Sequence, residues 1–417
     1  MEQGNIIIKN AAQLVTCSGY SAKKGRQMSD LSIIENGTIV ITDGKISYVG
    51  KDANCPPLSD FPNHEVVDAK GKAVLPGFID SHTHFIFGGY REEEFSWRMR
   101  GDSYMSIMER GGGIHNTMTA TRNASFGELK ESGRKRLDRM LAMGVTTVEG
   151  KSGYGMDKDT ELKQLEVMKA LNEEHPVDIV STFMGAHATP SEYKRREDDF
   201  LDYMIKEVMP VVKEKNLAEC CDIFCEKNVF DIEQSRRYLT AARDLGFKLK
   251  IHADEIEPLG GAELASEIGC ITADHLVAAS ERGMDMMAQK GVIANLLPAT
   301  SFNLQSGKFA QGRKMIDMGI PVSLSTDYNP GSCPTENLQL VMSFASIIMK
   351  LTPEEVITAV TINGACALGL ENEIGSIQEG KKADLVIFDA PNIEYIIYHF
   401  GINHAEKVIK NGLIVKK

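Results

Sequence analysis

The sequence lacks the features that would place the chain in a membrane or outside the cell. No apolar run approaches the ~18 residues that a membrane span needs, and the first residues, MEQGNIIIKNAAQL, show no basic stretch followed by a long apolar one. None of the eight cysteines stands in CxxC spacing, and a chain of 417 residues does not need disulfides to be stable. We therefore expect a soluble cytoplasmic protein with reduced thiols.

Positive charge is also scarce. The 46 Lys and Arg residues stand against 58 Asp and Glu, which gives a formal net charge of −12, and the basic residues form no block. Such a surface does not attract nucleic acid or anionic lipid, so neither is expected as a partner. An anionic small molecule would need a local arginine.

Both ends of the chain have the alternating pattern of β structure. Hairpin signals stand at Asp43-Gly44, Lys70-Gly71 and Asn411-Gly412, between runs rich in β-branched residues. Neither set of strands is large enough to stand alone. The sequence therefore predicts one small β-sandwich domain built from both termini, residues 1–73 and 375–417.

The region between these ends, residues 74–374, alternates short apolar runs with amphipathic stretches. Eight runs have the character of strands: 73–80, 145–150, 178–185, 221–226, 248–254, 271–276, 292–298 and 321–327. Helical spacing of apolar residues is clearest at 160–175, 198–215, 235–246 and 260–269. Eight β/α units predict the α/β fold of a (β/α)8 TIM barrel.

The first crossover of this barrel is unusually long. About forty residues separate Phe85 from the helix expected near Ser125, and they include the only tryptophan, Trp97, and a triple glycine at 111–113. Long loops in compact domains are usually functional or disordered. We predict that this loop forms part of the active-site wall.

Polar residues gather where the predicted strands end, which is where barrel enzymes carry their chemistry. They are His82, His84, Glu149, Lys151, Tyr154, His187, Glu226, His252, Glu255, His275, Asp327 and Asn329. A lone histidine at a strand end is usually structural. Five of the ten histidines on one face of the barrel favour a functional site instead.

The spacing of these residues predicts a metal centre. His82 and His84 stand two apart on one strand, so both imidazoles point toward the barrel axis. With His252 and Asp327 they offer three nitrogens and one oxygen, a set suited to Zn²⁺ or Fe²⁺ and poor for Mg²⁺ or Ca²⁺. Glu149 and Glu226 are expected to be structural or to support the ligands.

Several motifs resemble known enzymes. The order PGFIDSHTH, HADE and STDYNPGSCP resembles the amidohydrolase superfamily, whose metal-dependent barrels carry a β-sandwich built from both termini. Together with FIFGGYREEEF, GGGI, KSGYG, STFMGAHATP, KIHADEIEPLGGAELA and ADHL, these motifs resemble the imidazolonepropionase family over nearly the whole chain. The resemblance implies hydrolysis of the ring amide of 4-imidazolone-5-propanoate to N-formimidoyl-L-glutamate, in histidine degradation.

The resemblance also assigns residues. It implies metal binding by His82, His84, His252 and Asp327, substrate contacts by Arg91, Tyr154, His187 and Glu255, and Asn329, Gly331 and Ser332 close to the substrate. Two-metal members of the superfamily use a bridging lysine, whereas the predicted fourth strand ends in Glu226, so one ion is expected. Lys151, after the second strand, could be mistaken for that lysine.

Chemistry supports the same residues. A metal lowers the pKa of a bound water from 15.7 towards ~7, which supplies a nucleophile at neutral pH. Asp327 and His275 are placed to take the proton of that water, and Glu255 to protonate the departing ring nitrogen, while His187 or the metal polarises the carbonyl. Glu255, His275 and Asp327 are therefore the predicted catalytic residues.

Other interpretations remain open. Arg91 either binds the propionate carboxylate or only pairs with Glu92 to Glu94, Tyr154 either contacts substrate or only packs, and the triple glycine is either functional or a flexible turn. The rival functions are a metal-dependent purine or pyrimidine deaminase and an inactive barrel that only binds. A homodimer is one alternative for the assembly of the chain.

Overall fold

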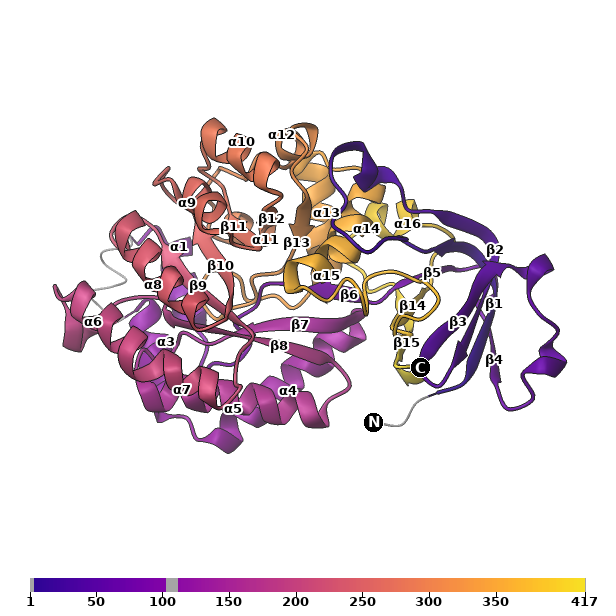
Figure 1. The fold of residues 1–417 in the computed structure, drawn as a ribbon, viewed down its shortest axis with the longest axis horizontal. Helices are drawn as coiled ribbons and strands as arrows, with labels where there is room; N and C mark the ends of the chain where they lie inside the picture. Colours follow the sequence, from indigo (N-terminus) through magenta and orange to yellow (C-terminus); the bar gives the residue numbers. More distant parts are fainter. Residues whose placement is uncertain (1–3, 103–111, 417) are drawn as a thin grey trace.

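Eight parallel strands from the middle of the chain form a barrel in the computed structural model, which describes residues 4–102 and 112–416 (Figure 1). Neighbours in chain order are hydrogen-bonded from the first strand to the eighth: β6 (Phe78–Asp80), β7 (Val145–Lys151), β8 (Asp178–Ala186), β9 (Cys220–Cys225), β10 (Lys248–Ala253), β11 (Thr272–His275), β12 (Ile293–Leu296) and β13 (Val322–Leu324). The predicted (β/α)8 barrel is confirmed.

The barrel closes just beyond the ends of its first and last strands. Thr83 and Tyr328 form an isolated parallel bridge, and the His84 N–H donates to the Tyr328 carbonyl at 2.8 Å. The Asp327 N–H donates to the carbonyl of His82 at 3.0 Å. These closing contacts fix the backbone of His82 and His84 beside that of Asp327.

Helices follow the barrel strands as the amphipathic pattern predicts. The stretches expected to be helical overlap α5 (Lys158–Glu174), α8 (Ile232–Asp244) and α9 (Gly261–Ile268), and the stretch 198–215 overlaps α6 (Glu197–Tyr203), the π-helix η5 (Met204–Val208) and α7 (Met209–Glu214). Further helices are α4 (Phe126–Ala142), α10 (Glu281–Lys290), α11 (Pro298–Asn303), α12 (Gly312–Asp317), α13 (Leu338–Met349), α14 (Pro353–Val360), α15 (Ile362–Leu368) and α16 (Ile393–Tyr398). Within residues 4–102 and 112–416, no helix is both long and apolar enough to cross a membrane.

A second sheet joins the two ends of the chain beside the barrel (Figure 1). Its strands are β1 (Ile6–Val15), β2 (Ile33–Thr42), β3 (Lys45–Lys51), β4 (Glu65–Asp68), β5 (Ala73–Pro76), β14 (Leu385–Phe388), β15 (Ala405–Lys410) and β16 (Leu413–Lys416). The order is β16-β15-β14-β5-β1-β2-β3, with β4 also paired to β1. This order confirms a sheet built from both termini.

Short 3₁₀ helices lie at Gly25–Ser29, Asp52–Asn54, Leu58–Asp60 and Ser191–Tyr193.

Two of the three predicted hairpin turns are present in this sheet. Asp43-Gly44 and Asn411-Gly412 connect antiparallel neighbours, and all four residues have positive φ. Lys70-Gly71 is not a hairpin, because β4 and β5 both run parallel to β1. That turn moves the chain along β1 without reversing it.

The predicted strand at 73–80 is two strands that belong to different sheets. β5 pairs with β1 and β14 in the terminal sheet, whereas β6 pairs with β7 in the barrel. Gly77 separates them, and a Cβ at this position would lie 2.2 Å from Oγ1 of Thr146. Glycine therefore lets the chain pass close to β7 as it enters the barrel. The division at residues 73/74 and 374/375 stays a prediction.

The long first crossover contains α1 (Glu92–Met99) and α3 (Ile114–Asn123). The buried carboxylate of Glu94 joins them, since it accepts from Nε of Arg91 at 3.1 Å and from the backbone N–H of Gly113 at 2.9 Å. Residues 103–111, which include the first glycine of the triple glycine, lie outside the described residues. The described part of this loop meets the barrel at its cavity.

Candidate active site

A cavity of about 700 Å³ lies at the ends of the barrel strands. Ten of the predicted site residues line it: His84, Arg91, Tyr154, His187, His252, Glu255, His275, Asp327, Asn329 and Ser332. His82 lies beneath the cavity with no exposed surface, and Gly331 lies next to Arg91. Strand-end residues that are far apart in the sequence therefore meet in one place.

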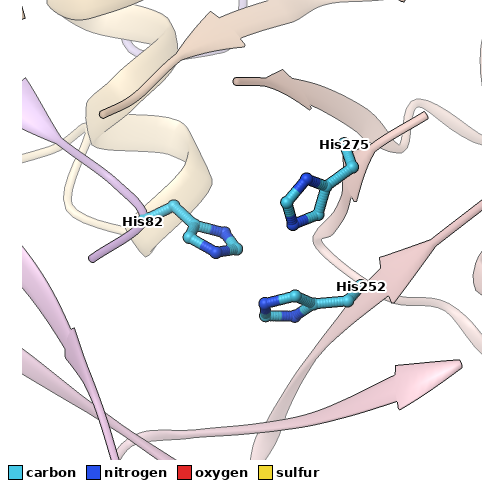
Figure 2. Close-up of side chains that lie close together, drawn as sticks. All are labelled: His82, His252 and His275. Carbon is cyan, nitrogen blue, oxygen red and sulfur yellow. The ribbon is translucent and has the colours of Figure 1, made fainter. Parts of the chain in front are cut away.

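The four predicted metal ligands converge at the floor of the cavity. Nε2 of His82 lies 3.4 Å, and Nε2 of His84 3.6 Å, from Oδ1 of Asp327. The His252 ring lies 4.6 Å from that of His82, and Figure 2 shows these two rings and that of His275 turned toward one another. Nε2 of His82 is buried and has no hydrogen-bond partner among the described residues. Three imidazoles and a carboxylate fit a divalent ion, which would satisfy this nitrogen.

Two carboxylates missed in the sequence orient these histidines. Nδ1 of His82 lies 2.6 Å from Oδ2 of Asp274, and Nδ1 of His252 lies 3.0 Å from Oδ2 of Asp222. Each contact places the ring proton on Nδ1, so the lone pair of Nε2 faces the site. Burial opposes ionisation of Asp222, but Lys151 and His252 hold its pKa well below the usual range.

Lys151 is fully buried near these two carboxylates and does not line the cavity. Its ammonium donates to Glu149 at 3.0 Å and to Asp222 at 2.7 Å. Glu226 is also outside the cavity lining, and its carboxylate accepts from the backbone of Lys227 and Ile256. Glu149 and Glu226 thus both have structural partners. Among the described residues, Lys151 is engaged with buried carboxylates and is not placed to bridge two metal ions.

Glu255 and His275 form the wall next to the predicted metal ligands. Burial, followed by the negative charge of Asp327, raises the pKa of Glu255 to about 8, so this carboxyl holds a proton at neutral pH. Burial also raises the pKa of Asp327 to about 6. Oδ2 of Asp327 accepts from Oγ1 of Thr300 at 2.6 Å, which leaves Oδ1 toward the histidines.

The ring proton of His187 is not on the nitrogen that would have to donate to a substrate carbonyl. Burial lowers its pKa to about 3, so the ring is neutral at physiological pH. Nδ1 lies 3.2 Å from the carbonyl of Gly153 and donates to it, which leaves Nε2 as an acceptor. This contact favours a bond from a ring N–H of the substrate over the predicted bond to its carbonyl. The buried ring of Tyr154 lies 5.3 Å from His187.

Arg91 pairs with Glu94 and also reaches the cavity, and its contact with substrate stays a prediction. Its Nε pairs with Glu94, and the guanidinium lines the cavity. A Cβ added to Gly331 would lie 2.2 Å from Nη2 of Arg91, so the absence of a side chain at Gly331 makes room for the guanidinium. Gly331 therefore leaves the space that the guanidinium of Arg91 occupies.

Asn329 organises the loop that follows the eighth strand. Its amide donates to the carbonyl of Asp327 at 2.7 Å and to Oγ of Ser332 at 2.8 Å. Its Oδ1 accepts from the backbone N–H groups of Gly331 and Ser332. Both amide hydrogens are thus engaged within the loop, and the contact of Asn329 with substrate stays a prediction.

Comparison with known proteins agrees with this geometry. A model of the amidohydrolase family matches residues 73–415. Imidazolonepropionases from Alkaliphilus metalliredigens and Parabacteroides distasonis are 56% and 55% identical to the chain over 412 residues, with 99% of this chain covered and 98% and 99% of those proteins. The imidazolonepropionase of Clostridium tetani is 53% identical over 417 residues, 100% of this chain and 99% of that protein. The chain belongs to the imidazolonepropionase family of amidohydrolases.

Solved structures of other enzymes share the fold. A 5-methylcytosine deaminase from Klebsiella pneumoniae superposes with a TM-score of 0.73 at 17% identity, covering 99% of this chain and 98% of that chain. An atrazine chlorohydrolase from Arthrobacter aurescens, solved with zinc, gives 0.74 at 18% identity, with 99% and 95% covered. At such identities the likeness concerns the fold alone. The full-length imidazolonepropionases favour that family over the rival deaminases.

The imidazolonepropionase motifs did not point to the outer part of the cavity. His115, Ser191, Lys194, Glu197 and Asn228 line it as well. They come from α3 and from segments after β8 and β9, and not from strand ends. Only their tertiary placement brings them to the site, so strand-end reasoning could not find them.

Proposed function

We propose that the chain hydrolyses the ring amide C–N bond of 4-imidazolone-5-propanoate and releases N-formimidoyl-L-glutamate, a step of histidine degradation. The observation that carries the proposal is the presence of Arg91 in the same cavity as the predicted metal ligands. A guanidinium binds a carboxylate through two parallel hydrogen bonds. The identity to proteins named imidazolonepropionase supports the same reaction.

One divalent ion, Zn²⁺ or Fe²⁺, would be held by His82, His84, His252 and Asp327. When bound, such an ion acts as a Lewis acid and makes water a usable nucleophile at neutral pH. The partnerless buried Nε2 of His82 and the Nδ1 contacts of His82 and His252 support this set of ligands. The preference for Zn²⁺ or Fe²⁺ follows from the mixture of imidazole and carboxylate donors.

The side chains of the cavity would divide the remaining work. Arg91 binds the propionate carboxylate, while Tyr154 flanks the ring and Nε2 of His187 accepts from a ring N–H. Asp327 and His275 take up the proton that the attacking water loses. Protonated Glu255 gives its proton to the ring nitrogen as the C–N bond breaks, which makes that nitrogen a neutral leaving group.

This proposal needs a small molecule as its only partner, and we expect the reaction in the cytoplasm. The test is to mix metal-loaded protein with 4-imidazolone-5-propanoate and follow its ultraviolet spectrum, N-formimidoyl-L-glutamate and ammonia. We expect substrate loss and equal formation of N-formimidoyl-L-glutamate, without ammonia. Release of ammonia would favour a deaminase. Tight binding without turnover would favour an inactive barrel.

A further inference from the structure

Beneath the predicted metal ligands lies a layer of five charged side chains with no exposed surface. They come from four barrel strands, β7, β9, β10 and β11: Glu149, Lys151, Asp222, Lys250 and Asp274. Isolated charges are costly to bury, so such a layer is tolerated only where its members pair. Several of the ion pairs in this layer involve Lys151.

The ammonium of Lys151 lies between the two carboxylates that hold the ligand histidines. Its Nζ is 2.7 Å from Oδ2 of Asp222 and 3.7 Å from Oδ2 of Asp274. The same two oxygens contact Nδ1 of His252 at 3.0 Å and Nδ1 of His82 at 2.6 Å. A continuous set of contacts therefore runs from one ligand histidine to the other through a single ammonium.

We propose that Lys151 is a positioning residue for the metal centre, acting through Asp222 and Asp274 on His252 and His82. The inference rests on the proposed function, because it assumes that these histidines bind an ion. The Asp222 carboxylate must stay in place beside Nδ1 of His252 to hold the ring proton on that nitrogen. Without Lys151, its charge would lose its closest buried cation. The His252 ring could then rotate or change tautomer, and the Nε2 lone pair would no longer be fixed toward the ion.

The test compares Lys151→Met with a matched control at Lys410. Lys410 is also buried and also contacts two carboxylates, those of Asp178 at 2.7 Å and Asp384, but it lies in the terminal sheet on β15. Lys410→Met removes the same kind of buried ion pair without touching a ligand histidine. Both variants should lower the thermal unfolding midpoint of the metal-free protein.

Only the Lys151 variant should change the metal centre. Competition of metal-free protein with a chelator of known affinity measures Zn²⁺ binding, and the visible spectrum of bound Co²⁺ reports ligand geometry. We expect Lys151→Met to bind Zn²⁺ about 10- to 100-fold more weakly and to alter the Co²⁺ spectrum. Lys410→Met should match the original protein in both. Equal Zn²⁺ affinity and equal Co²⁺ spectra for Lys151→Met would overturn the inference.

A second pair of variants keeps the test valid if Lys151→Met does not fold. Asp274→Asn combined with Lys151→Met has the same formal charge in the buried layer as the original protein. The double variant should bind Zn²⁺ at least about tenfold more weakly than Asp274→Asn alone, because Asp222 still loses its cation. Equal affinities would refute the role of Lys151. Absence of Zn²⁺ binding by the original protein would instead refute the proposed metal site.

Discussion

The carboxylate of Glu255 lies 3.6 Å from Nε2 of His275, on the cavity wall beside the predicted metal ligands. Glu255 follows β10, and His275 ends β11, so adjacent strands of the barrel bring them together. Burial makes the first a proton donor and leaves the second neutral, because it lowers the pKa of His275 well below its usual value. A protonated carboxyl and a neutral imidazole therefore stand side by side.

Replacing Glu255 by Gln should leave the metal in place and lower kcat by about 10²- to 10⁴-fold, because the amide keeps the shape but cannot pass on a proton. Metal content and steady-state rates measure the two effects. Glu257→Gln, at an exposed position on the same loop, is the control and should be fully active. Unchanged turnover in Glu255→Gln would remove this residue from the mechanism.

The metal-free protein should show the raised pKa of Glu255 as a pH-dependent stability. The folded state holds this proton more tightly than the unfolded chain, so the contribution is complete below about pH 4.5 and is lost as the pH rises through about 8. Glu255→Gln has no ionisable group at this position, so it does not lose this stability as the pH rises. Unfolding midpoints at pH 5, 7 and 9 should therefore fall less in Glu255→Gln than in the original protein, whereas parallel curves would contradict the assignment.

Arg91→Lys should weaken substrate binding although it keeps the charge, because an ammonium lacks the paired geometry of a guanidinium. We expect KM to rise about 10- to 100-fold, more for Arg91→Ala, with metal content unchanged. Steady-state kinetics on 4-imidazolone-5-propanoate and on an analogue without the carboxylate measure this effect. Equal harm to both substrates would show that Arg91 is structural. Arg100→Lys, exposed beyond the end of α1, serves as the control.

Gly331→Ala should act like a mild Arg91 variant. The new methyl group would meet Nη2 of Arg91 and displace the guanidinium, the far end of a flexible side chain. We expect a raised KM for the carboxylate substrate and a stability change of less than about 1 kcal/mol. Gly127→Ala, where an added Cβ meets no atom within 4 Å, is the control. An unchanged KM would mean that Arg91 does not need this space.

Elemental analysis should find one metal ion per chain, lost on His252→Ala. The described residues offer another group of possible ligands in His82, Glu149 and Asp274, but the ammonium of Lys151 lies 3.0 Å from Glu149 and 3.7 Å from Asp274. A second divalent ion would be repelled there. Two ions in the active protein, both lost on His252→Ala, would contradict the single-ion site.

The strand-end residues could be predicted because two regularities suffice to place them. Side chains two apart on a strand share a face, and parallel barrel strands end on the same side. His82, His84 and His252 follow from these rules alone. The outer residues, such as Lys194, depend on how loops fold back over the barrel, and no local pattern encodes that.

The buried layer had a signal that sequence reasoning did not use. Asp222, Lys250 and Asp274 are charged residues inside apolar barrel strands, and a charge in such a strand must find a partner. Which charges pair could not be deduced, because the pairing depends on the register between strands. The separation of β5 from β6 was missed for a similar reason. Pro76-Gly77 is a turn signal, but the change of sheet is a tertiary event.

The strand β5, which ends just before Gly77, has to wait for its partner strand while the protein is synthesised. β5 lies just before the first barrel strand, yet its neighbour β14 ends more than three hundred residues later, at Phe388. A ribosome releases the N-terminal strands first, at about 5–20 residues per second. All eight barrel strands emerge before β14 can pair with β5. The terminal sheet is therefore completed only after the whole barrel has been translated, and until then the edge of β5 that β14 covers stays unpaired.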